Sequence, residues 1–255
     1  MIFVFKCMTG LGNRLCNLFN MFYLHKIYPS AEIYLIWSIN NHCGAKLDEL
    51  IDMTQYRWIR TEGEYMSKVY PRFRNIMLYA YTCKRERTRW DNPDEWGRHQ
   101  LVVSVPNTLY SFIPHEFCVE TYNAFSLTVG VAAAVQATIS RYGINRELIH
   151  FRTGDLLKIL DDNKESHKAR LVERFTTIKA QFPAAAVVEY TQMIVDRPAV
   201  AVIEAFAELV FYTKHCRIVA YTPYSWFSSL VIFLNSGYRA GLPVFDSDIL
   251  DIIQV

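Results

Sequence analysis

The stretch that decides the fold is IFVFKCMTGLGNRLCNLFNMFYLHKIYPSAEIYLIW, residues 2–37. Its start, 2–6, is apolar and rich in Phe and Val, which predicts a β-strand. Apolar residues then recur at helical spacing over 13–28, and Pro29 ends the expected helix. A second strand is expected over 32–37. This strand, loop, helix and strand order predicts the start of a parallel sheet.

The same alternation continues along the chain. Further strands are expected over 100–105, 147–151, 184–191, 217–222 and 243–246, and further helices over 126–142, 198–215 and 225–237. A cluster of prolines in the middle of the chain predicts a boundary there. We therefore expect an α/β protein with two Rossmann-like βαβ domains, an N-terminal domain over 1–115 and a C-terminal domain over 116–255.

The composition narrows the class of protein. The chain has 255 residues with a net charge of +2, and this balance gives no electrostatic reason to expect a nucleic-acid partner. Its 6 cysteines are scattered without a CxxC pair, so spacing predicts buried, reduced thiols rather than a zinc site. The apolar start is too short for a signal peptide, and the longest weakly polar run is too short to cross a bilayer. We expect a soluble, cytoplasmic protein without a transmembrane segment.

The segment TGLGNRL (9–15) lies between the first expected strand and helix. Glycines there let the backbone approach a ligand, and free N–H groups at a helix start favour an anion. The segment departs from a dinucleotide fingerprint because Leu15 occupies the third glycine position, which disfavours a nicotinamide oxidoreductase. A tight turn without a ligand is the alternative interpretation.

The segment HFRTGD (150–155) follows an expected strand, at the end where open α/β sheets bind ligands. Arg152 offers two parallel donors and a permanent charge, which suit a diphosphate. His150 precedes it by two residues and therefore lies on the same side of an extended strand. Asp155 is placed to brace Arg152, and a plain ion pair between these two residues is the alternative.

The segment YSWFSS (224–229) lies at the start of the last expected helix. Hydroxyl and backbone N–H groups at a helix start suit phosphate oxygens. The alternative is that Ser225 is an ordinary N-cap.

The order of these three segments resembles the fucosyltransferase superfamily, whose members use GDP-fucose on a GT-B fold. An A-x-x-E-A-x-x-x-L pattern, on which Glu204 and Ala205 fall, precedes the third segment and adds to the resemblance. The resemblance implies a GT-B-like fold with two Rossmann-like domains facing a central cleft. It also implies that the domain over 1–115 lies on the acceptor side and that the domain over 116–255 binds the nucleotide-sugar donor. The chain is short for such an enzyme, so we expect a fold of reduced size.

The resemblance also implies roles for individual residues. Arg152 would clamp the donor pyrophosphate and neutralise charge as the nucleoside diphosphate leaves. Gly10, Gly12 and Asn13 would face the donor from the N-terminal domain, and Arg14 would either brace this loop or add charge. The full set expected to bind the donor, besides Arg152, is Gly10, Gly12, Asn13, Arg14, His150, Asp155, Asp196, Ser225, Trp226, Phe227 and Ser228.

The activity implied is inverting transfer of fucose from GDP-fucose to a hydroxyl of a glycan or glycoprotein, without a metal or other cofactor. No Asp-x-Asp motif follows a strand at the expected site. His42, Asp48 and Glu49 follow the second strand on the acceptor side, and Asp48 is the candidate general base, although it is equally placed to begin a helix.

Two alternatives stay open. Gln192 stands where many members of the superfamily have an acid, with Asp196 as a substitute, so another GDP- or UDP-linked pentose or hexose, such as xylose, is a second possible donor. A non-catalytic glycan-binding module would also keep this fold. Aromatic residues within 54–96 would then stack on sugars, unless they belong to the core.

Overall fold

The computed structural model describes residues 1–71, 101–104, 113–144, 146–152, 173, 175–190, 196–221 and 226–235. The chain divides into two compact units, Met1–Thr128 (unit 1) and Val129–Val255 (unit 2). This division lies further along the chain than the predicted boundary after residue 115. The reason is that α5 (His115–Asn123) packs against α1 (Leu11–Ile27), with the ring of Phe117 at an edge of the ring of Tyr23.

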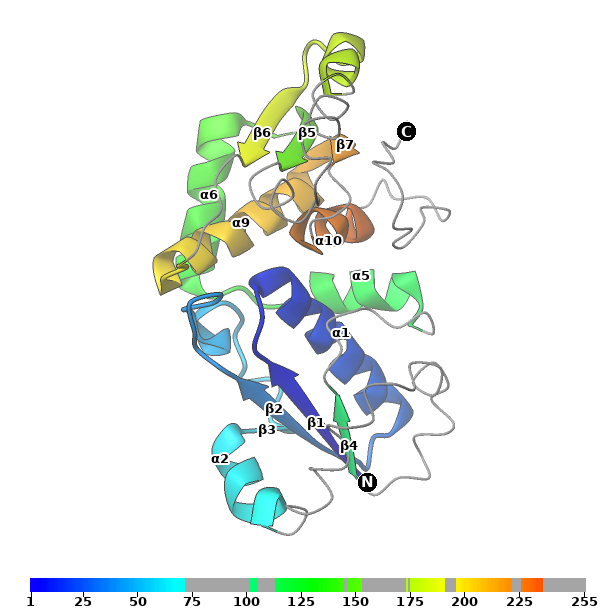
Figure 1. The fold of residues 1–255 in the computed structure, drawn as a ribbon, viewed down its shortest axis with the longest axis vertical. Helices are drawn as coiled ribbons and strands as arrows, with labels where there is room; N and C mark the ends of the chain where they lie inside the picture. Colours follow the sequence, from blue (N-terminus) through cyan, green and yellow to red (C-terminus); the bar gives the residue numbers. More distant parts are fainter. Residues whose placement is uncertain are drawn as a thin grey trace, which may run out of the picture. The chain divides into compact units, whose positions relative to one another are not determined.

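Within the described residues, unit 1 contains a parallel sheet of four strands in the order β3-β2-β1-β4 (Figure 1). The strands are β1 (Ile2–Cys7), β2 (Glu32–Trp37), β3 (Ile59–Arg60) and β4 (Leu101–Ser104). Besides α1 and α5, the described part of unit 1 contains the 3-10 turn η1 (Leu47–Glu49), the short helix α2 (Glu62–Glu64) and the π-helical turn η2 (Tyr65–Val69). The sheet and the α1 crossover form a Rossmann-like half. The strands predicted over 2–6, 32–37 and 100–105 are confirmed.

The burial of both faces of β1 explains why its residues 2–5 are an unbroken apolar run. Phe3 and Phe5 are buried on one side of the strand, and Val4, between them, is buried on the other. Val4 belongs to a cluster with Tyr65 and Val69 of the π-helical turn. A central parallel strand is covered on both faces, so it shows no alternation of apolar and polar residues.

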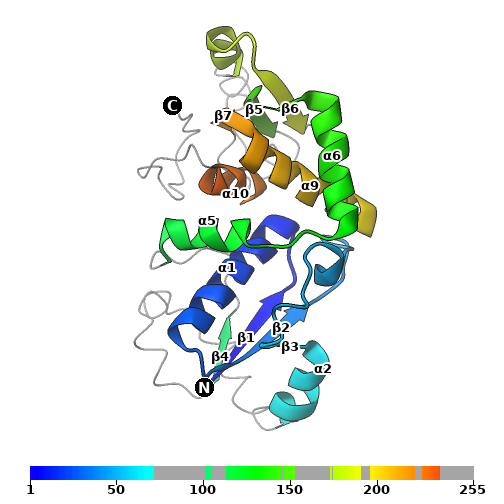
Figure 2. The ribbon, with the colours of Figure 1, turned by 180° about the vertical axis from the view of Figure 1, so that it is seen from behind.

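Unit 2 contains, within its described residues, a parallel sheet of three strands in the order β6-β5-β7. The strands are β5 (Arg146–Arg152), β6 (Ala186–Tyr190) and β7 (Cys216–Tyr221), and the helices are α6 (Val129–Tyr142), α9 (Ala199–His215) and α10 (Trp226–Leu234), with residues 175–181 also helical. The helix α9 packs on α6, β7 and α10 (Figure 2). The strands predicted over 147–151, 184–191 and 217–222 are confirmed, and the one predicted over 243–246 lies outside the described residues.

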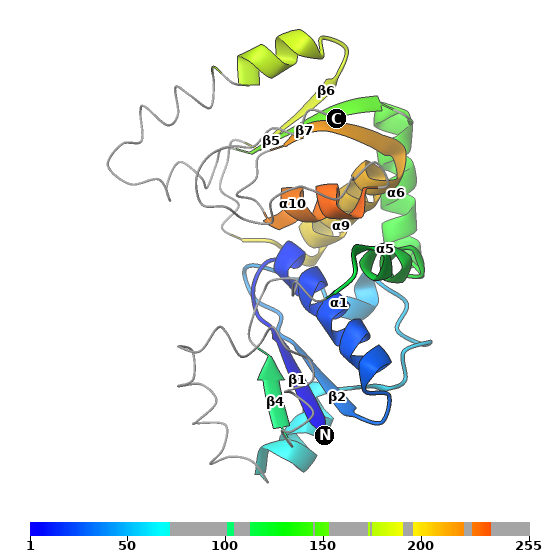
Figure 3. The ribbon, with the colours of Figure 1, turned by 90° about the vertical axis from the view of Figure 1, so that its right-hand side faces the viewer.

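Two helices begin at places that differ from the prediction. The helix α1 starts at Leu11, two positions before the predicted start at residue 13, and runs along β1 (Figure 3). The helix α6 starts at Val129 rather than at residue 126, because the chain just before it pairs with the segment after η1. There the carbonyl of Ser126 accepts a hydrogen bond from the N–H of Asp52 at 2.8 Å. The helix ends at Tyr142 and is followed by Gly143, whose φ of +76° favours a residue without a Cβ.

One buried amide ties the C-terminal end of α10 to the junction between α9 and β7. The Nδ2 of Asn235 donates to the carbonyl oxygens of Tyr212 at 3.1 Å, Thr213 at 3.2 Å and Cys216 at 2.9 Å. These carbonyls close α9 and open β7. The amide therefore satisfies acceptors at a helix end that have no partner inside the helix.

The described cysteines are free thiols, as the sequence predicted, namely Cys7, Cys16, Cys43, Cys118 and Cys216. Burial raises the pKa of Cys7 to about 12 and that of Cys118 to about 12. Among the described helices, none has both the length and the apolar character that a bilayer span requires.

Candidate functional site

The carboxyl ends of β1 and β2 are joined by the side chain of Asn40. Its Nδ2 donates to the carbonyl of Met8 at 2.7 Å. Its Oδ1 accepts from the N–H groups of His42 at 3.0 Å and Cys43 at 3.2 Å. Asn40 is not among the residues predicted from the sequence. The sequence feature that indicates its role is the pair Asn40 and Asn41 just after a strand. In such turns the side-chain oxygen of an asparagine accepts a hydrogen bond from the backbone N–H two residues later.

Arg14 lies at the same edge of the sheet and is fully buried, with 0% of its surface exposed. Its Nε donates to the carbonyl of Thr9, and its Nη2 donates to Oδ1 of Asn40 at 3.2 Å. The guanidinium carbon lies 5.0 Å from the centre of the Trp37 ring. Burial lowers the pKa of Arg14. Of the two roles left open for Arg14, the contacts support the brace, and a contact with the donor stays a prediction.

The glycine segment is a helix start rather than a loop, which corrects the expectation. Gly10 is the N-cap of α1 in an extended conformation, while Gly12, Asn13 and Arg14 all lie inside the helix. The cap has no side-chain hydrogen bond, and the first turn contains no acidic residue. Backbone N–H groups at such a helix start favour an anion. Contact of Gly10, Gly12 and Asn13 with a donor stays a prediction.

The acceptor-side residues His42, Asp48 and Glu49 are all exposed in unit 1. The carboxylate of Glu49 accepts from the backbone N–H of Lys46 at 2.6 Å and so caps η1. Its backbone carbonyl accepts from Oγ1 of Thr128 at 2.7 Å. The placement of Asp48 in the first turn of η1 fits the helix-start interpretation, and its role as a base stays a prediction.

In unit 2, Arg152 is the last residue of β5, the middle strand, and pairs in register with Tyr190 of β6. Arg152 thus occupies the carboxyl end of the sheet, the edge at which open α/β sheets bind ligands. Two of the predicted donor-binding residues, Asp155 and Ser225, lie outside the described residues. The backbone of Trp226 and Ser228 lies in the first turn of α10.

The structure brings two predicted site residues together, His150 of β5 and Phe227 of α10. Their ring centres lie 6.0 Å apart, and the His150 ring also contacts Tyr212 of α9 at 5.9 Å. His150 is 1% exposed, so the two helices cover its imidazole. The structure gives His150 a packing role, and contact with the donor stays a prediction.

The predicted donor-binding residue Asp196 is exposed and lies two residues before Pro198, the N-cap of α9.

The described parts of the two units contain no cluster of side chains that could bind a metal ion. Among those residues, no three of His, Cys, Asp or Glu lie close enough together to hold an ion.

No protein-family model matches the chain, and its sequence matches no curated protein. The fold does match solved structures. A NodZ α-1,6-fucosyltransferase soaked with GDP-fucose aligns with a TM-score of 0.56 at 12% identity, over 91% of this chain and 92% of that chain. NodZ from Bradyrhizobium aligns with a TM-score of 0.54 at 12% identity, over the same shares of 91% and 92%.

A third NodZ structure, co-crystallised with GDP, aligns with a TM-score of 0.52 at 12% identity, over 90% of this chain and 91% of that chain. At 12% sequence identity, the similarity between this chain and the NodZ structures is one of fold. Each of the two units contains a parallel sheet, and the alignment with the NodZ structure covers 91% of this chain. These findings confirm the α/β architecture that the sequence predicted. The chain thus has a GT-B fold of the kind found in fucosyltransferase structures.

Proposed function

We propose that this protein is a glycosyltransferase that transfers fucose from GDP-fucose to a hydroxyl of a glycan or glycoprotein, with inversion and without a metal. One observation carries the proposal. The middle strand of unit 2 ends in an arginine, Arg152, on a fold that aligns with a fucosyltransferase structure soaked with GDP-fucose. Ligands bind open α/β sheets at this end of the strands.

The chemistry follows from charge. Breaking the bond between sugar and phosphate builds negative charge on the departing nucleoside diphosphate. The guanidinium of Arg152 and the free N–H groups at the start of α10 take up that charge in our proposal. One preorganised donor of this kind lowers a barrier by about 3–4 kcal/mol. A positive group fixed in the protein thereby performs the task that a divalent cation performs in other transferases.

Other residues have supporting roles in the proposal. Gly10, Gly12 and Asn13 contact the donor from unit 1. His42 and Glu49 lie on the acceptor side, and Asp48 is the candidate base for the acceptor hydroxyl. Exposure of all three acceptor-side residues leaves them accessible to a glycan.

Donor binding is the first test. Calorimetry with GDP, GDP-fucose and UDP-sugars, each with and without EDTA, should give binding of the GDP compounds that chelation does not alter. A panel of donors, read by mass spectrometry of the glycan product, then identifies the sugar. The absence of nucleotide binding at millimolar concentration contradicts the proposal. Transfer of xylose or another sugar would change the donor and keep the reaction.

The Arg152→Ala variant tests the residue that carries the proposal. Turnover should fall about 10²- to 10³-fold, because one preorganised charge is removed from the leaving group. A suitable control is Arg217→Ala, since Arg217 forms a half-exposed ion pair with Glu147 at 3.1 Å in the same unit. Both variants should keep the wild-type circular dichroism spectrum. Near-normal turnover of Arg152→Ala would show that Arg152 is not the leaving-group clamp, and glycan binding without any turnover would favour a binding module.

A further inference from the structure

A segment from much further along the chain pairs with the residues that follow the turn η1. Segments 126–128 and 50–52 run antiparallel, with a bridge between Leu127 and Ile51. Next to this bridge each segment donates one backbone N–H to the other, at 2.8 Å and 3.3 Å. These two bonds join backbone to backbone and therefore hold the chain after η1 whatever side chains lie there.

The side chain of Thr128 extends this hold into η1 itself. Its Oγ1 donates to the backbone carbonyl of Glu49, the last residue of η1, at 2.7 Å. Its N–H donates to the carbonyl of Leu50, the next residue, at 3.3 Å. The last carbonyl groups of a helical turn have no partner inside the turn, so Thr128 supplies partners for two successive carbonyls at this end.

The position of η1 depends on such contacts because the turn is short. A 3-10 turn of 3 residues has little stability of its own. Its N-terminal end is fixed from within, since the carboxylate of Glu49 accepts from the N–H of Lys46 at 2.6 Å. Its C-terminal end is fixed from outside by Thr128, while Leu47 and Leu50 are buried.

Asp48 lies between these two fixed ends, and its side chain is exposed. The backbone of η1 therefore sets the direction in which the Asp48 carboxylate leaves the turn. A general base must lie within hydrogen-bond reach of the proton that it removes. A misplacement of about 1 Å can cost about 10²-fold in rate, so whatever fixes η1 also affects the reaction.

We propose that Thr128 is a positioning residue for the acceptor side of the protein. Its hydroxyl and N–H fix the backbone of η1, and thereby the place from which the carboxylate of Asp48 takes the proton of an acceptor hydroxyl. This inference rests on the proposed function for the acceptor and the reaction. The positioning itself rests on the hydrogen bonds of segment 126–128.

Hydrogen exchange of the full chain without substrate tests the hold on η1. The amides of Leu50 and Ile51 donate to the carbonyl of Leu47 at 3.0 Å and 2.9 Å and report whether the turn is closed. Thr128→Val removes the hydroxyl and keeps the N–H, so both amides should exchange about fivefold faster, because one hydrogen bond to the turn is lost. Thr128→Ser keeps the hydroxyl and should exchange at the wild-type rate.

Two further variants serve as controls for this measurement. Thr128→Ala removes the same hydroxyl without placing a methyl group against the carbonyl of Glu49, and should give the same result as Thr128→Val. Thr138→Val removes a hydroxyl that bonds the carbonyl of Ala134 at 2.9 Å in unit 2, and should leave the amides of η1 unchanged. Wild-type exchange rates in both Thr128→Val and Thr128→Ala overturn the proposal without reference to any activity.

Kinetics with acceptor and donor varied separately test the role in transfer. Thr128→Val should lower kcat/KM for the acceptor about fivefold and leave the dissociation constant of GDP unchanged, because the hydroxyl holds the acceptor-side turn. In the Asp48→Asn background the same substitution should cause no further loss, since Thr128 acts through Asp48. A role in stability alone would change neither constant below the melting temperature. Equal losses in both backgrounds overturn the proposal.

The outcomes separate this inference from the proposed function. An unchanged kcat/KM for the acceptor in an active Thr128→Val variant overturns the positioning role and leaves the glycosyltransferase proposal standing. A wild-type chain that transfers no sugar contradicts the proposed function, and the role of Thr128 with it.

Discussion

The side chain of Asn40 forms four hydrogen bonds, three with backbone groups and one with the side chain of Arg14. Its side chain donates once, to Met8, and accepts from the N–H groups of His42 and Cys43 and from Arg14. The bonds to Met8 and His42 are exposed, whereas those from Arg14 and Cys43 are partly buried, and losing an acceptor costs most where water does not replace it. A single amide therefore holds two loops and a buried cation.

The substitution Asn40→Ala should lower the free energy of unfolding by about 1–2 kcal/mol, because it leaves Nη2 of the buried Arg14 and the N–H of Cys43 without this acceptor. Urea unfolding followed by circular dichroism measures the change. The neighbouring Asn41 is exposed, so Asn41→Ala is the matched control and should stay within about 0.5 kcal/mol of wild type. Equal unfolding midpoints for the two variants would contradict the role given to Asn40.

His150 illustrates a limit of reasoning from residue spacing. Alternation along a strand predicts that His150 and Arg152 lie on the same side of β5, but alternation does not reveal which side chains cover a strand. The structure packs its ring against Tyr212 and Phe227, two residues far along the sequence. Only the order of strands and helices in space decides whether such a side chain meets solvent or aromatic rings.

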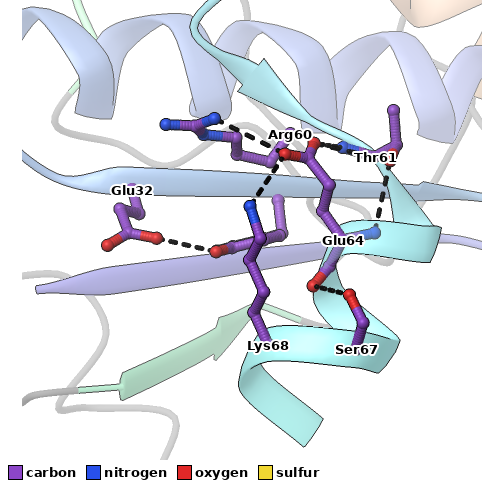
Figure 4. A network of polar contacts seen from close by, with 7 residues as sticks. Glu32, Arg60, Thr61, Glu64, Ser67 and Lys68 are labelled. Atoms are coloured by element: carbon purple, nitrogen blue, oxygen red, sulfur yellow. Dashed lines mark hydrogen bonds and ion pairs between the residues drawn. The ribbon is translucent and has the colours of Figure 1, made fainter.

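At the scale of elements, the short helix α2 depends on a reciprocal cap (Figure 4). Oγ1 of Thr61 accepts from the N–H of Glu64 at 3.3 Å, and the Glu64 carboxylate accepts from the N–H of Thr61 at 3.0 Å. Arg60 and Lys68 each approach the same carboxylate at 3.4 Å. The bond from Thr61, followed by these two cations, lowers the pKa of Glu64.

This cap predicts a dependence of stability on pH. Because the pKa of Glu64 is lower in the folded state than in the unfolded state, its ionised form stabilises the fold. The contribution is present above the unfolded-state pKa and is lost as pH falls through the folded-state pKa. The difference in unfolding free energy between wild type and Glu64→Gln should therefore shrink between neutral and acidic pH.

The control for this measurement is Glu62→Gln, in the first turn of the same helix. Glu62 is exposed, and its carboxylate accepts no hydrogen bond within the described part of the chain. Its effect should change less with pH than that of Glu64→Gln. A constant difference between wild type and Glu64→Gln across the whole titration would show that the carboxylate does not act through its charge.

At the scale of the whole molecule, binding of the donor nucleotide should raise stability by mass action. If the proposed function holds, GDP at about 100 times its dissociation constant adds about 2.7 kcal/mol to the unfolding free energy of the unit that binds it. Calorimetric melting with increasing GDP measures this gain, and EDTA should leave it unchanged. The Arg152→Ala variant should show a smaller gain at equal GDP, while a gain that chelation removes would contradict metal independence.

Much of the fold was predictable because hydrophobic periodicity reports local burial. The runs around β1, β2 and β5 and the helical spacing of α9 contain that information in neighbouring residues. The start of α6 was placed three residues early, because Ser126 resembles a cap and the sequence does not show that Asp52 bonds its carbonyl. Pairing between distant segments of this kind decides element boundaries and is invisible to a local pattern.

The sequence by itself determined the fold class, the alternation of the longer strands and helices, and the two chemically marked segments around Gly10 and Arg152, whereas β3, α2 and α5 were not predicted. Those features depend on residues close together in the chain, whose burial and turn preferences follow from local periodicity. Only the tertiary structure showed that Arg14 is buried against Asn40, that His150 lies beneath Phe227, and that Asn235 closes α9. The physical reason is that partners of buried polar groups are supplied by elements distant in sequence, so their identity emerges when the chain packs.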